Sequence, residues 1–436
     1  MWAENAVIYQ IYPLGLCGAP YENDGILSKR LAVLDDSWIE HIKKLGVDTV
    51  LFNPLFESDT HGYNTRDYRK VDCRLGTNED FKELCDKLHS NGMKVMLDGV
   101  FNHVGRGFAG FEDVLKNRWE SKYSNWFHIN FDGNNSYNDG LWYEGWEGNY
   151  DLVKLNLDNY EVCDYLMDSV RLWIDEFDID GLRLDVAYMV NRNFLKRLRE
   201  QTSAWKKDFF LFGEMLGGDY KQILNDEMCH SVTNYECFKG IFSAINSRNL
   251  FEIIHSLLRQ FGKEPWCLYT GKNLISFVDN HDVTRIASNL QDERDLPIAY
   301  TIMYAMPGIP CIYYGSEWGI KGDKSSGDQA LRPMIEKPQW NSLCDHIKAL
   351  SEAKRNEAAL TKGDFKSLVL ENRHCIFERQ WQDERIMTAI NIDDEPYVFH
   401  FNANAGRAHD LITGEVIDFG GGLEVPGHTS YVLKPF

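Results

Sequence analysis

Three carboxylates stand where apolar segments of the chain end, and carboxylates in such places can serve as nucleophile, acid or base. They are Asp185, Glu214 and Asp282, which end the segments 181–185, 210–214 and 277–282. A strand buried on both faces reads as a continuous apolar run. An ionised group at the end of such a strand destabilises the fold unless it faces solvent, forms an ion pair or takes part in a reaction. The pattern therefore predicts that these side chains meet at one functional rim.

The neighbouring residues predict a different task for each carboxylate. Arg183 and Asp185 lie two positions apart on one strand, so both side chains point to the same side. Arg183 is therefore expected to stabilise the ionised form of Asp185 as a nucleophile. Partial desolvation is expected to keep Glu214 protonated as an acid. The charge of Asp282 should raise the proton affinity of Glu214 further.

Strand-like and helix-like patterns alternate from the start of the sequence to about residue 355. The strand-like segments are residues 7–12, 49–53, 95–100, 181–185, 209–213, 231–235, 275–279 and 309–313. Helix-like stretches between them include residues 37–45, 79–91, 162–175 and 193–202. Strands that alternate with amphipathic helices imply parallel pairing, and eight such units predict a closed (β/α)8 TIM barrel. The functional face of that fold lies at the carboxyl ends of its strands.

Two departures from this alternation predict further domains. Residues 104–158 are rich in Gly, Asn, Trp and Tyr with little helical period, and are far too long for an ordinary loop. They are interpreted as a subdomain B inserted after the third strand, between barrel parts 1–103 and 159–361. Residues 362–436 predict a C-terminal antiparallel β-sandwich, with strands at 366–371, 374–379, 385–392, 397–401 and 430–433.

Composition limits the possible binding partners and the cellular compartment of the protein. The net charge of −20 argues against nucleic acid or an anionic membrane as partner. The longest apolar stretch, residues 296–315, is interrupted by Pro and Gly and is interpreted as a buried helix, a turn and a strand. The first residues lack the basic start of a signal peptide. Ten cysteines without a CxxC pair predict free thiols in a reducing cytoplasm.

At this point the chain resembles the α-amylase family of glycoside hydrolases over essentially its whole length. The family's motifs occur in order at residues 98–103 (DGVFNH), 181–185 (GLRLD), 213–214 (GE) and 277–282 (FVDNHD), with further matches at 61–68, 145–148 and 152–156. The resemblance implies that Asp185 is the nucleophile and Glu214 the acid/base. It implies that Asp282 binds sugar hydroxyls and favours the distorted transition state.

The same resemblance implies a set of substrate-binding residues. It comprises Tyr63, Asp98, His103, Arg183, His281 and Trp146. His103 and His281 would hydrogen-bond the reacting sugar, and Tyr63 would stack on its ring. Structural alternatives remain open for several of them: Asp98 could orient Arg183, Tyr63 could close the barrel end, and Trp142 and Trp146 could pack the insertion.

One departure from the family concerns metal. Many α-amylases hold a calcium ion between insertion and barrel, with the asparagine equivalent to Asn102 among its ligands. Lys154 and Met189 stand here at two other ligand positions, and neither a cation nor a thioether suits calcium. We therefore assign no metal and no cofactor, while a metal held by oxygen groups of a nearby loop elsewhere stays open. Lysine at this position is typical of the cyclodextrin- and pullulan-degrading branch.

These observations predict a cytoplasmic, retaining α-glucan hydrolase that cleaves α-1,4 bonds of maltooligosaccharides, with cyclodextrins and pullulan as further candidate substrates. The first barrel strand begins near Val7, so the N-terminal β-domain usual in that branch is not expected, nor is a starch-binding module. A transglycosidase of the 4-α-glucanotransferase type is the alternative, because the same residues serve both reactions. A non-catalytic carbohydrate-binding protein is the remote alternative. The oligomeric state is left open.

Overall fold

Eight short parallel strands form the centre of the molecule. The computed structural model describes residues Met1 to Phe436, and its largest sheet has the order β13-β12-β11-β5-β2-β1-β15-β14. A parallel bridge between Thr233 and Ile275 joins the two end strands and closes the sheet into a barrel. The strands are β1 (Ile8–Ile11), β2 (Thr49–Phe52), β5 (Lys94–Gly99), β11 (Gly181–Leu184), β12 (Phe210–Gly213), β13 (Ser231–Val232), β14 (Ile275–Ser276) and β15 (Ile309–Tyr313). The predicted (β/α)8 barrel is confirmed.

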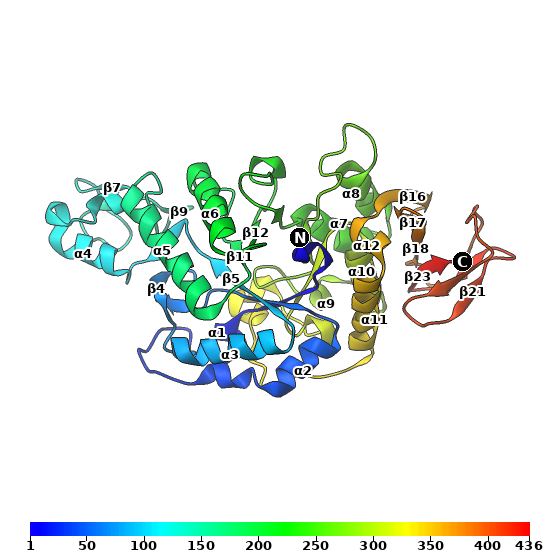
Figure 1. Ribbon diagram of the computed structural model, residues 1–436, viewed down its shortest axis with the longest axis horizontal. Coiled ribbons are helices and arrows are strands. Elements are labelled where there is room, and N and C mark those ends of the chain that lie inside the picture. Colours follow the sequence, from blue (N-terminus) through cyan, green and yellow to red (C-terminus); the bar gives the residue numbers. More distant parts are fainter.

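Helices surround this barrel and follow every strand except β12, which is linked to β13 only through the 3-10 turn Tyr220–Gln222 (Figure 1). They are α1 (Pro13–Leu16), α2 (Asp36–Lys44), α3 (Asn78–Ser90), α5 (Tyr160–Phe177), α6 (Arg192–Trp205), α7 (Tyr235–Asn246), α8 (Phe251–Phe261), α9 (Ile286–Asn289), α10 (Leu296–Ala305), α11 (Ser342–Asn356) and α12 (Ala358–Lys362). The four predicted helical stretches correspond to α2, α3, α5 and α6.

Local sequence explains where these helices begin and which face they bury. In α3, the Thr77 side chain accepts from Asp80 N–H while the Asp80 carboxylate accepts from Thr77 N–H, which forms a capping box.

Helix α10 is buried all round apart from Pro297 near its start. The apolar stretch 296–315 is thus a buried helix, a turn and strand β15, as predicted. None of the helices combines the length and the apolarity needed to span a lipid bilayer.

The barrel interior changes from apolar to polar along each strand. Side chains alternate between the two faces of a strand, so the inward-facing series in β1 begins with Ile8 and continues with Gln10. Neighbouring strands repeat the change, from Leu51 to Asn53 and from Met96 to Asp98. Gln10 donates to Asn53 at 2.9 Å, and Asn53 donates to Asp98 at 3.0 Å. The result is a hydrogen-bonded polar layer at the carboxyl ends of the strands.

Two smaller units carry residues over that polar layer. The antiparallel pair β3 (Phe56–Ser58) and β4 (Thr65–Val71) presents the turn that contains Tyr63. The insertion contains β6 (His103–Gly105), α4 (Ala109–Asn117), β7 (Ile129–Asn130), β8 (Trp142–Tyr143), β9 (Gly145–Trp146) and β10 (Asn149–Lys154). Helix α4 was not expected there. It is only nine residues long and buries Phe111 and Val114, which is too few apolar positions for a clear helical period.

The C-terminal part of the chain forms two antiparallel layers. A six-stranded sheet has the order β16-β17-β18-β23-β20-β21, and β19 pairs with β22. The strands are β16 (Asp364–Leu370), β17 (His374–Trp381), β18 (Glu384–Asn391), β19 (Tyr397–Phe399), β20 (Arg407–Asp410), β21 (Val416–Asp418), β22 (Leu423–Val425) and β23 (Thr429–Pro435). Strands β20, β21 and β22 were not predicted because they are three or four residues long and lie among turns.

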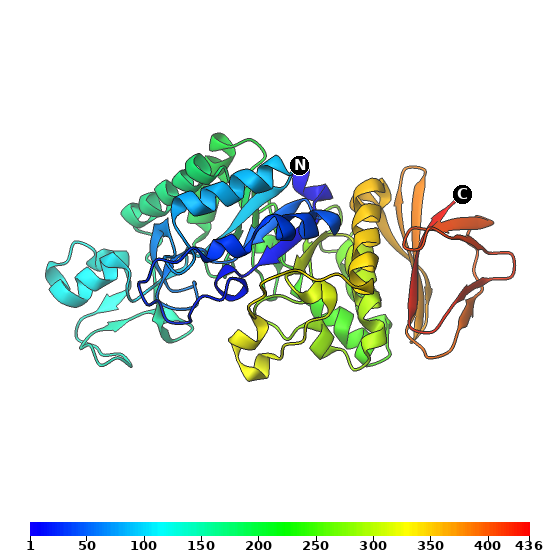
Figure 2. The same cartoon turned by 90° about the horizontal axis from the view of Figure 1, so that it is seen from below.

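The two additions lie at opposite ends of the barrel in both views of the ribbon (Figures 1 and 2). The core of the C-terminal layers includes Ile376 and Met387 from one layer and Phe399 and Val425 from the other. This arrangement agrees with the predicted C-terminal β-sandwich. All ten cysteines are free thiols, and nine of them are buried.

Candidate active site

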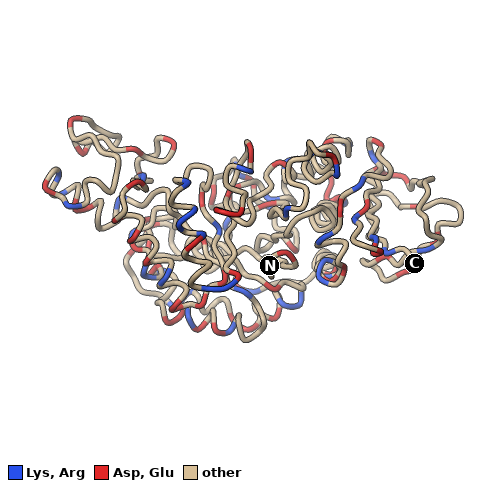
Figure 3. The backbone as a smooth tube through the Cα atoms, turned by 45° about the horizontal axis from the view of Figure 1, so that its top comes forward, with Lys and Arg blue, Asp and Glu red and all other residues tan.

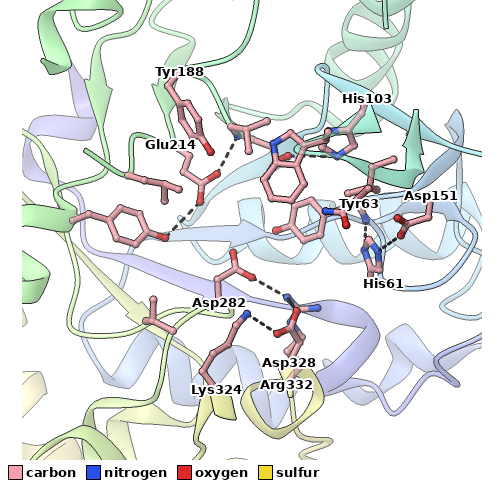
Figure 4. A pocket seen from close by; sticks show the side chains of 18 residues that line it. His61, Tyr63, His103, Asp151, Tyr188, Glu214, Asp282, Lys324, Asp328 and Arg332 are labelled. Atoms are coloured by element: carbon pink, nitrogen blue, oxygen red, sulfur yellow. Dashed lines mark hydrogen bonds and ion pairs between the residues drawn. The ribbon is translucent and has the colours of Figure 1, made fainter. Parts of the chain in front are cut away.

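A cavity of about 500 Å³ opens at the carboxyl ends of the barrel strands, and it brings the three predicted catalytic carboxylates together (Figure 4). Asp185 follows β11, Glu214 follows β12, and Asp282 lies in the loop after β14. Three predicted substrate-binding residues also line it: Tyr63, His103 and Trp146. The other three, Asp98, Arg183 and His281, do not line it.

Arg183 is the electrostatic centre of the cavity floor. Its side chain is buried, and its Nη1 lies 2.6 Å from Asp98 Oδ2 and 3.1 Å from Asp185 Oδ1. Its Nη2 lies 2.8 Å from Glu214 Oε1. One guanidinium therefore bridges three carboxylates that come from three adjacent strands, β5, β11 and β12. The ion pair between Arg183 and Glu214 was not expected from the sequence.

This sharing changes the expected ionisation of Asp185. Burial raises the pKa of Asp185 well above its ordinary value, Arg183 opposes this effect, and the charges of Glu214 and Asp98 add to it. Arg183 favours the ionised form of Asp185, in the expected direction, but it does not outweigh burial and the two neighbouring carboxylates. The physical reason is that a single positive charge is divided among three anions in a buried site.

Asp282 has its own cation. Its carboxylate lies 2.9 Å from Arg332 Nη2 and 2.9 Å from His281 Nε2. Burial opposes ionisation of Asp282, but His281 and Arg332 outweigh it and hold the pKa of this carboxyl well below its ordinary range. The negative charge of Asp282 is thus paired within its own cluster. No motif marks Arg332 in the sequence, and only its place after the last barrel strand could have drawn attention to it.

Three residues of the cavity wall have buried polar atoms without a protein partner. They are His103 Nε2, Trp146 Nε1 and Tyr188 Oη. Burial, with a smaller contribution from His61, lowers the pKa of His103 to about 3, so its ring is neutral. Asn102 Nδ2 lies 3.2 Å from His103 Nδ1 and can only donate, which leaves the ring hydrogen on Nε2. A buried donor without a partner is costly, so these atoms are suited to ligand hydroxyls.

The side chains of Tyr63, His281 and Asp98 are fixed by contacts with one another and with their neighbours. The rings of Tyr63 and His281 are stacked, with centroids 5.6 Å apart and an interplanar angle of 8°, and Tyr63 Oη donates to Asp98 at 3.1 Å. Asn53 and Arg183 also donate to Asp98. Asp98 is therefore surrounded by protein donors below the cavity, which favours its orienting role over direct contact with a ligand.

The rim contains residues to which the sequence analysis assigned no role. His61 Nε2 lies 3.8 Å from Asp151 Oδ2 and so connects the barrel to the insertion. Lys324 and Asp328 form an ion pair at another part of the rim, next to Arg332 (Figure 4). Further lining residues are Asn149, Leu152, Val186, Leu216, Tyr235 and Val283. Asn149 and Leu152 lie on strand β10 and Tyr235 begins helix α7, whereas Val186, Leu216 and Val283 lie outside the helices and strands. Tertiary packing brings them together, and such packing leaves no periodic signal in the sequence.

The junction between barrel and insertion does not fit calcium. Lys154 is opposite His103 in the β6–β10 pair, and its ammonium forms an ion pair with Glu144. A cation therefore occupies the position where calcium needs an anionic oxygen. Two other clusters of side chains lie close enough together to hold a metal ion, one around Asp72 and one around Asp295. Their central carboxylates are already paired within the protein: Asp72 with Arg74, and Asp295 with His428 and Arg248.

Comparison with known proteins identifies a family and several relatives to which this chain is similar. Residues 36–384 match the model of the α-amylase catalytic domain. A cyclomaltodextrinase from a Bacillus species is 30% identical over 429 residues, which cover 90% of this chain and 73% of the relative. An intracellular maltogenic amylase from Bacillus subtilis is 28% identical, over 92% of this chain and 69% of its own length.

A solved structure extends the likeness to the whole fold. The debranching enzyme of Nostoc punctiforme, soaked with acarbose, has a TM-score of 0.81 and 28% identity, and the match covers 99% of this chain and 98% of that one. Residues that match the catalytic-domain model make up more than half of the chain, and the chain therefore belongs to the α-amylase family.

Proposed function

We propose that this protein is a retaining α-glucan hydrolase that cleaves α-1,4-glucosidic bonds of maltooligosaccharides, with cyclodextrins and pullulan as further substrates. The observation that carries the proposal is the meeting of Asp185, Glu214 and Asp282 in one cavity. Relatives named cyclomaltodextrinase and maltogenic amylase support the substrate class. The unpartnered polar atoms of His103, Trp146 and Tyr188 support a ligand rich in hydroxyl groups.

The proposed reaction is a double displacement. Asp185 attacks the anomeric carbon while Glu214 gives its proton to the glycosidic oxygen, which forms a covalent glycosyl-enzyme and releases the first product. Glu214 then takes a proton from water, and the resulting hydroxide equivalent frees the sugar from Asp185.

Arg183 is suited to both halves of this cycle. When Glu214 carries its proton, the negative charge next to Arg183 lies on Asp185 before the attack, and it lies on Glu214 once the covalent bond has neutralised Asp185. Because the two guanidinium nitrogens lie 3.1 Å from Asp185 and 2.8 Å from Glu214, the cation stays next to the charge in both states. Little reorganisation is then needed as the charge moves, which is the condition for efficient electrostatic catalysis.

Asp282 and His103 have complementary properties for binding the reacting sugar. The low pKa of Asp282 keeps it an acceptor of hydroxyl hydrogens. The neutral ring of His103 offers a donor 3.9 Å from Asp185 Oδ2. We assign sugar-hydroxyl contacts to both side chains, and we assign orientation of Arg183 to Asp98.

A cytoplasmic location is part of the same proposal. The ten free thiols support a reducing compartment, and the Bacillus subtilis relative is named an intracellular enzyme. Basic residues are interspersed with more numerous acidic ones along the chain (Figure 3), which favours a neutral saccharide over nucleic acid as ligand.

The experiment is a product profile from maltoheptaose, a cyclodextrin and pullulan incubated in parallel. Shorter linear maltooligosaccharides are the expected products, and an identically purified Glu214→Gln protein controls for contaminating amylases. Products longer than the starting maltoheptaose would identify a transglycosidase instead. Failure to cleave any of the three glucans would contradict the proposal.

A further inference from the structure

A separate hollow of about 190 Å³ lies at the end of the barrel opposite the catalytic cavity. Two of its lining residues mark that end, because Phe210 begins β12 and Ile309 begins β15. The others come from helix α6, from the first residues of the chain and from the loops that lead into β13 and β14. They include Arg199, Asn225, Asp226, His230, Lys272 and Asn273. We call this space the amino-end hollow.

Arg199 brings to the amino-end hollow a positive charge that no acidic side chain pairs. Its Nη1 is buried and has no hydrogen-bond partner in the protein, and burial lowers the pKa of the guanidinium. An arginine nevertheless stays charged in proteins. A charge that is taken out of water without a counter-ion destabilises the fold. A bound anion would remove this cost.

His230 supplies a neutral donor near Arg199. Burial, with a smaller contribution from Arg199, lowers the pKa of His230 to about 3, so its ring is neutral near pH 7. His230 Nδ1 accepts from Leu211 N–H at 3.0 Å, which leaves the ring hydrogen on Nε2. Because His230 lines the hollow, this hydrogen is available to a ligand that accepts.

The two carboxylates of the amino-end hollow have cations of their own. Asp226 Oδ1 lies 3.8 Å from Lys272 Nζ, and the Asp226 side chain is fully exposed to solvent. Glu4 Oε1 lies 3.1 Å from the amino group of Met1. Neither carboxylate forms an ion pair with Arg199, so the charge of this guanidinium is left for a ligand.

This set of groups suits a phosphate. A guanidinium offers its donors in a fork that matches the oxygens of a phosphate, and a lysine adds a point charge. Lys272 and the side-chain amide of Asn273 are at hand in the same hollow. The volume of about 190 Å³ is below the roughly 300–1,000 Å³ typical of pockets for larger ligands. A single phosphate group is therefore a better match than a nucleotide.

We propose that the amino-end hollow binds a phosphate group, either as inorganic phosphate or as the phosphate of a small monoester, and that Arg199 pairs its charge. This inference goes beyond the proposed function, because the catalytic carboxylates lie at the other end of the barrel. An anion that binds only the folded chain stabilises it. The bound phosphate takes no part in the cleavage of a glucan.

Isothermal titration calorimetry of the whole protein with inorganic phosphate tests the proposal, in buffers whose ionic strength is matched with chloride. The wild type should bind one phosphate per chain in a saturable manner. Arg199→Met should weaken binding by at least about tenfold, and Lys272→Gln should weaken it less, because this lysine is 45% exposed. Arg197→Met is the matched control, since Arg197 lies on the same helix, pairs with Asp164 and does not line the hollow. It should bind phosphate like the wild type.

Melting temperatures separate loss of the site from loss of the fold. Without phosphate, Arg199→Met should melt no lower than the wild type, because methionine replaces an unpaired charge by an apolar side chain of similar length. Phosphate also stabilises proteins through exclusion from their surface, so the diagnostic result is a larger increase in the wild type than in Arg199→Met.

A parallel titration with methyl phosphate distinguishes the two sources of the phosphate group. Binding as tight as that of inorganic phosphate indicates a monoester, and weaker binding indicates the free ion. A wild type that shows no saturable binding of either compound would overturn the inference, as would equal binding by Arg199→Met. Cleavage of maltoheptaose by the same preparations tests the proposed function separately, so the two can fail independently.

Discussion

Arg332 Nη2 lies 2.9 Å from Asp282, the one predicted catalytic carboxylate with which Arg183 forms no ion pair. The two arginines thus divide the carboxylates of the site between them. Asp185 and Glu214 share Arg183, and Asp282 belongs to Arg332. This division keeps the charge of Asp282 compensated while charge moves between the other two.

Replacement of Arg332 by Gln should weaken catalysis and change its pH dependence. A hydrogen bond to a charged group contributes about 1.5–3 kcal/mol, so kcat/KM on 4-nitrophenyl α-maltoside should fall roughly ten- to a hundredfold. Without the cation the pKa of Asp282 rises, so the acid limb of the pH profile should move to higher pH. Arg332→Lys should restore part of both effects. An acid limb that stays in place in Arg332→Gln would contradict this positioning role.

Substitution of either central carboxylate should remove activity but not folding. Asp185→Asn and Glu214→Gln are expected to lower kcat by orders of magnitude, because neither displacement proceeds without its partner. Azide should partly rescue Asp185→Gly as an external nucleophile. Asp168→Asn, on the outer surface of α5 and 76% exposed, is the control that should keep full activity. A kcat within about tenfold of wild type, or roughly 1.4 kcal/mol, would show the role assignment to be wrong.

Removal of calcium should leave the junction between barrel and insertion unchanged. The ion pair of Lys154 with Glu144 takes the place of a metal there, so a chelator should not change the melting temperature or the activity. Lys154→Ala should cost at most about 1 kcal/mol, because the pair is partly exposed to solvent. A loss of several degrees on chelation, reversed by calcium in the wild type and lost in Lys154→Ala, would contradict the assignment.

Acid should destabilise the fold through His346. Burial lowers the pKa of His346 to about 4 from an ordinary value of 6.5. Between these values the unfolded chain binds a proton that the folded chain does not, so stability falls as the pH falls from 6.5 towards 4. The slope from this residue is at most about 1.4 kcal/mol per pH unit.

Urea unfolding at pH 6.5, 5.5 and 4.5 measures this slope. His346→Gln should lose less stability over this range than the wild type, because glutamine does not titrate. The substitution also changes the contacts with Thr301 and the carbonyl oxygen of Pro297, so only the difference in slope is diagnostic. Equal slopes for the two proteins would exclude His346 as a source of the acid sensitivity.

The barrel was predictable because its strands are buried on both faces and read as apolar runs. The inward positions then change to Asp98, Arg183 and Asp185 at the rim, which marks the functional end. Contacts of Arg183 with Asp185 and Asp98 could be expected from the sequence, but its ion pair with Glu214 could not, because Glu214 follows a different strand and only strand pairing in the barrel brings the two together. Arg332 and Tyr188 lie in loops, where no periodicity records which cavity a side chain faces.

The configuration of the first product shows whether Asp185 forms a covalent intermediate. Double displacement through Asp185 retains the anomeric configuration, so hydrolysis of an α-1,4 bond must first release the α-anomer. Proton NMR of a fresh maltooligosaccharide hydrolysate, recorded before mutarotation, distinguishes the two anomers. An initial α-anomer signal that later relaxes to the equilibrium mixture is the expected result. An initial β-anomer signal would mean inversion and would contradict the assignment of Asp185 as nucleophile.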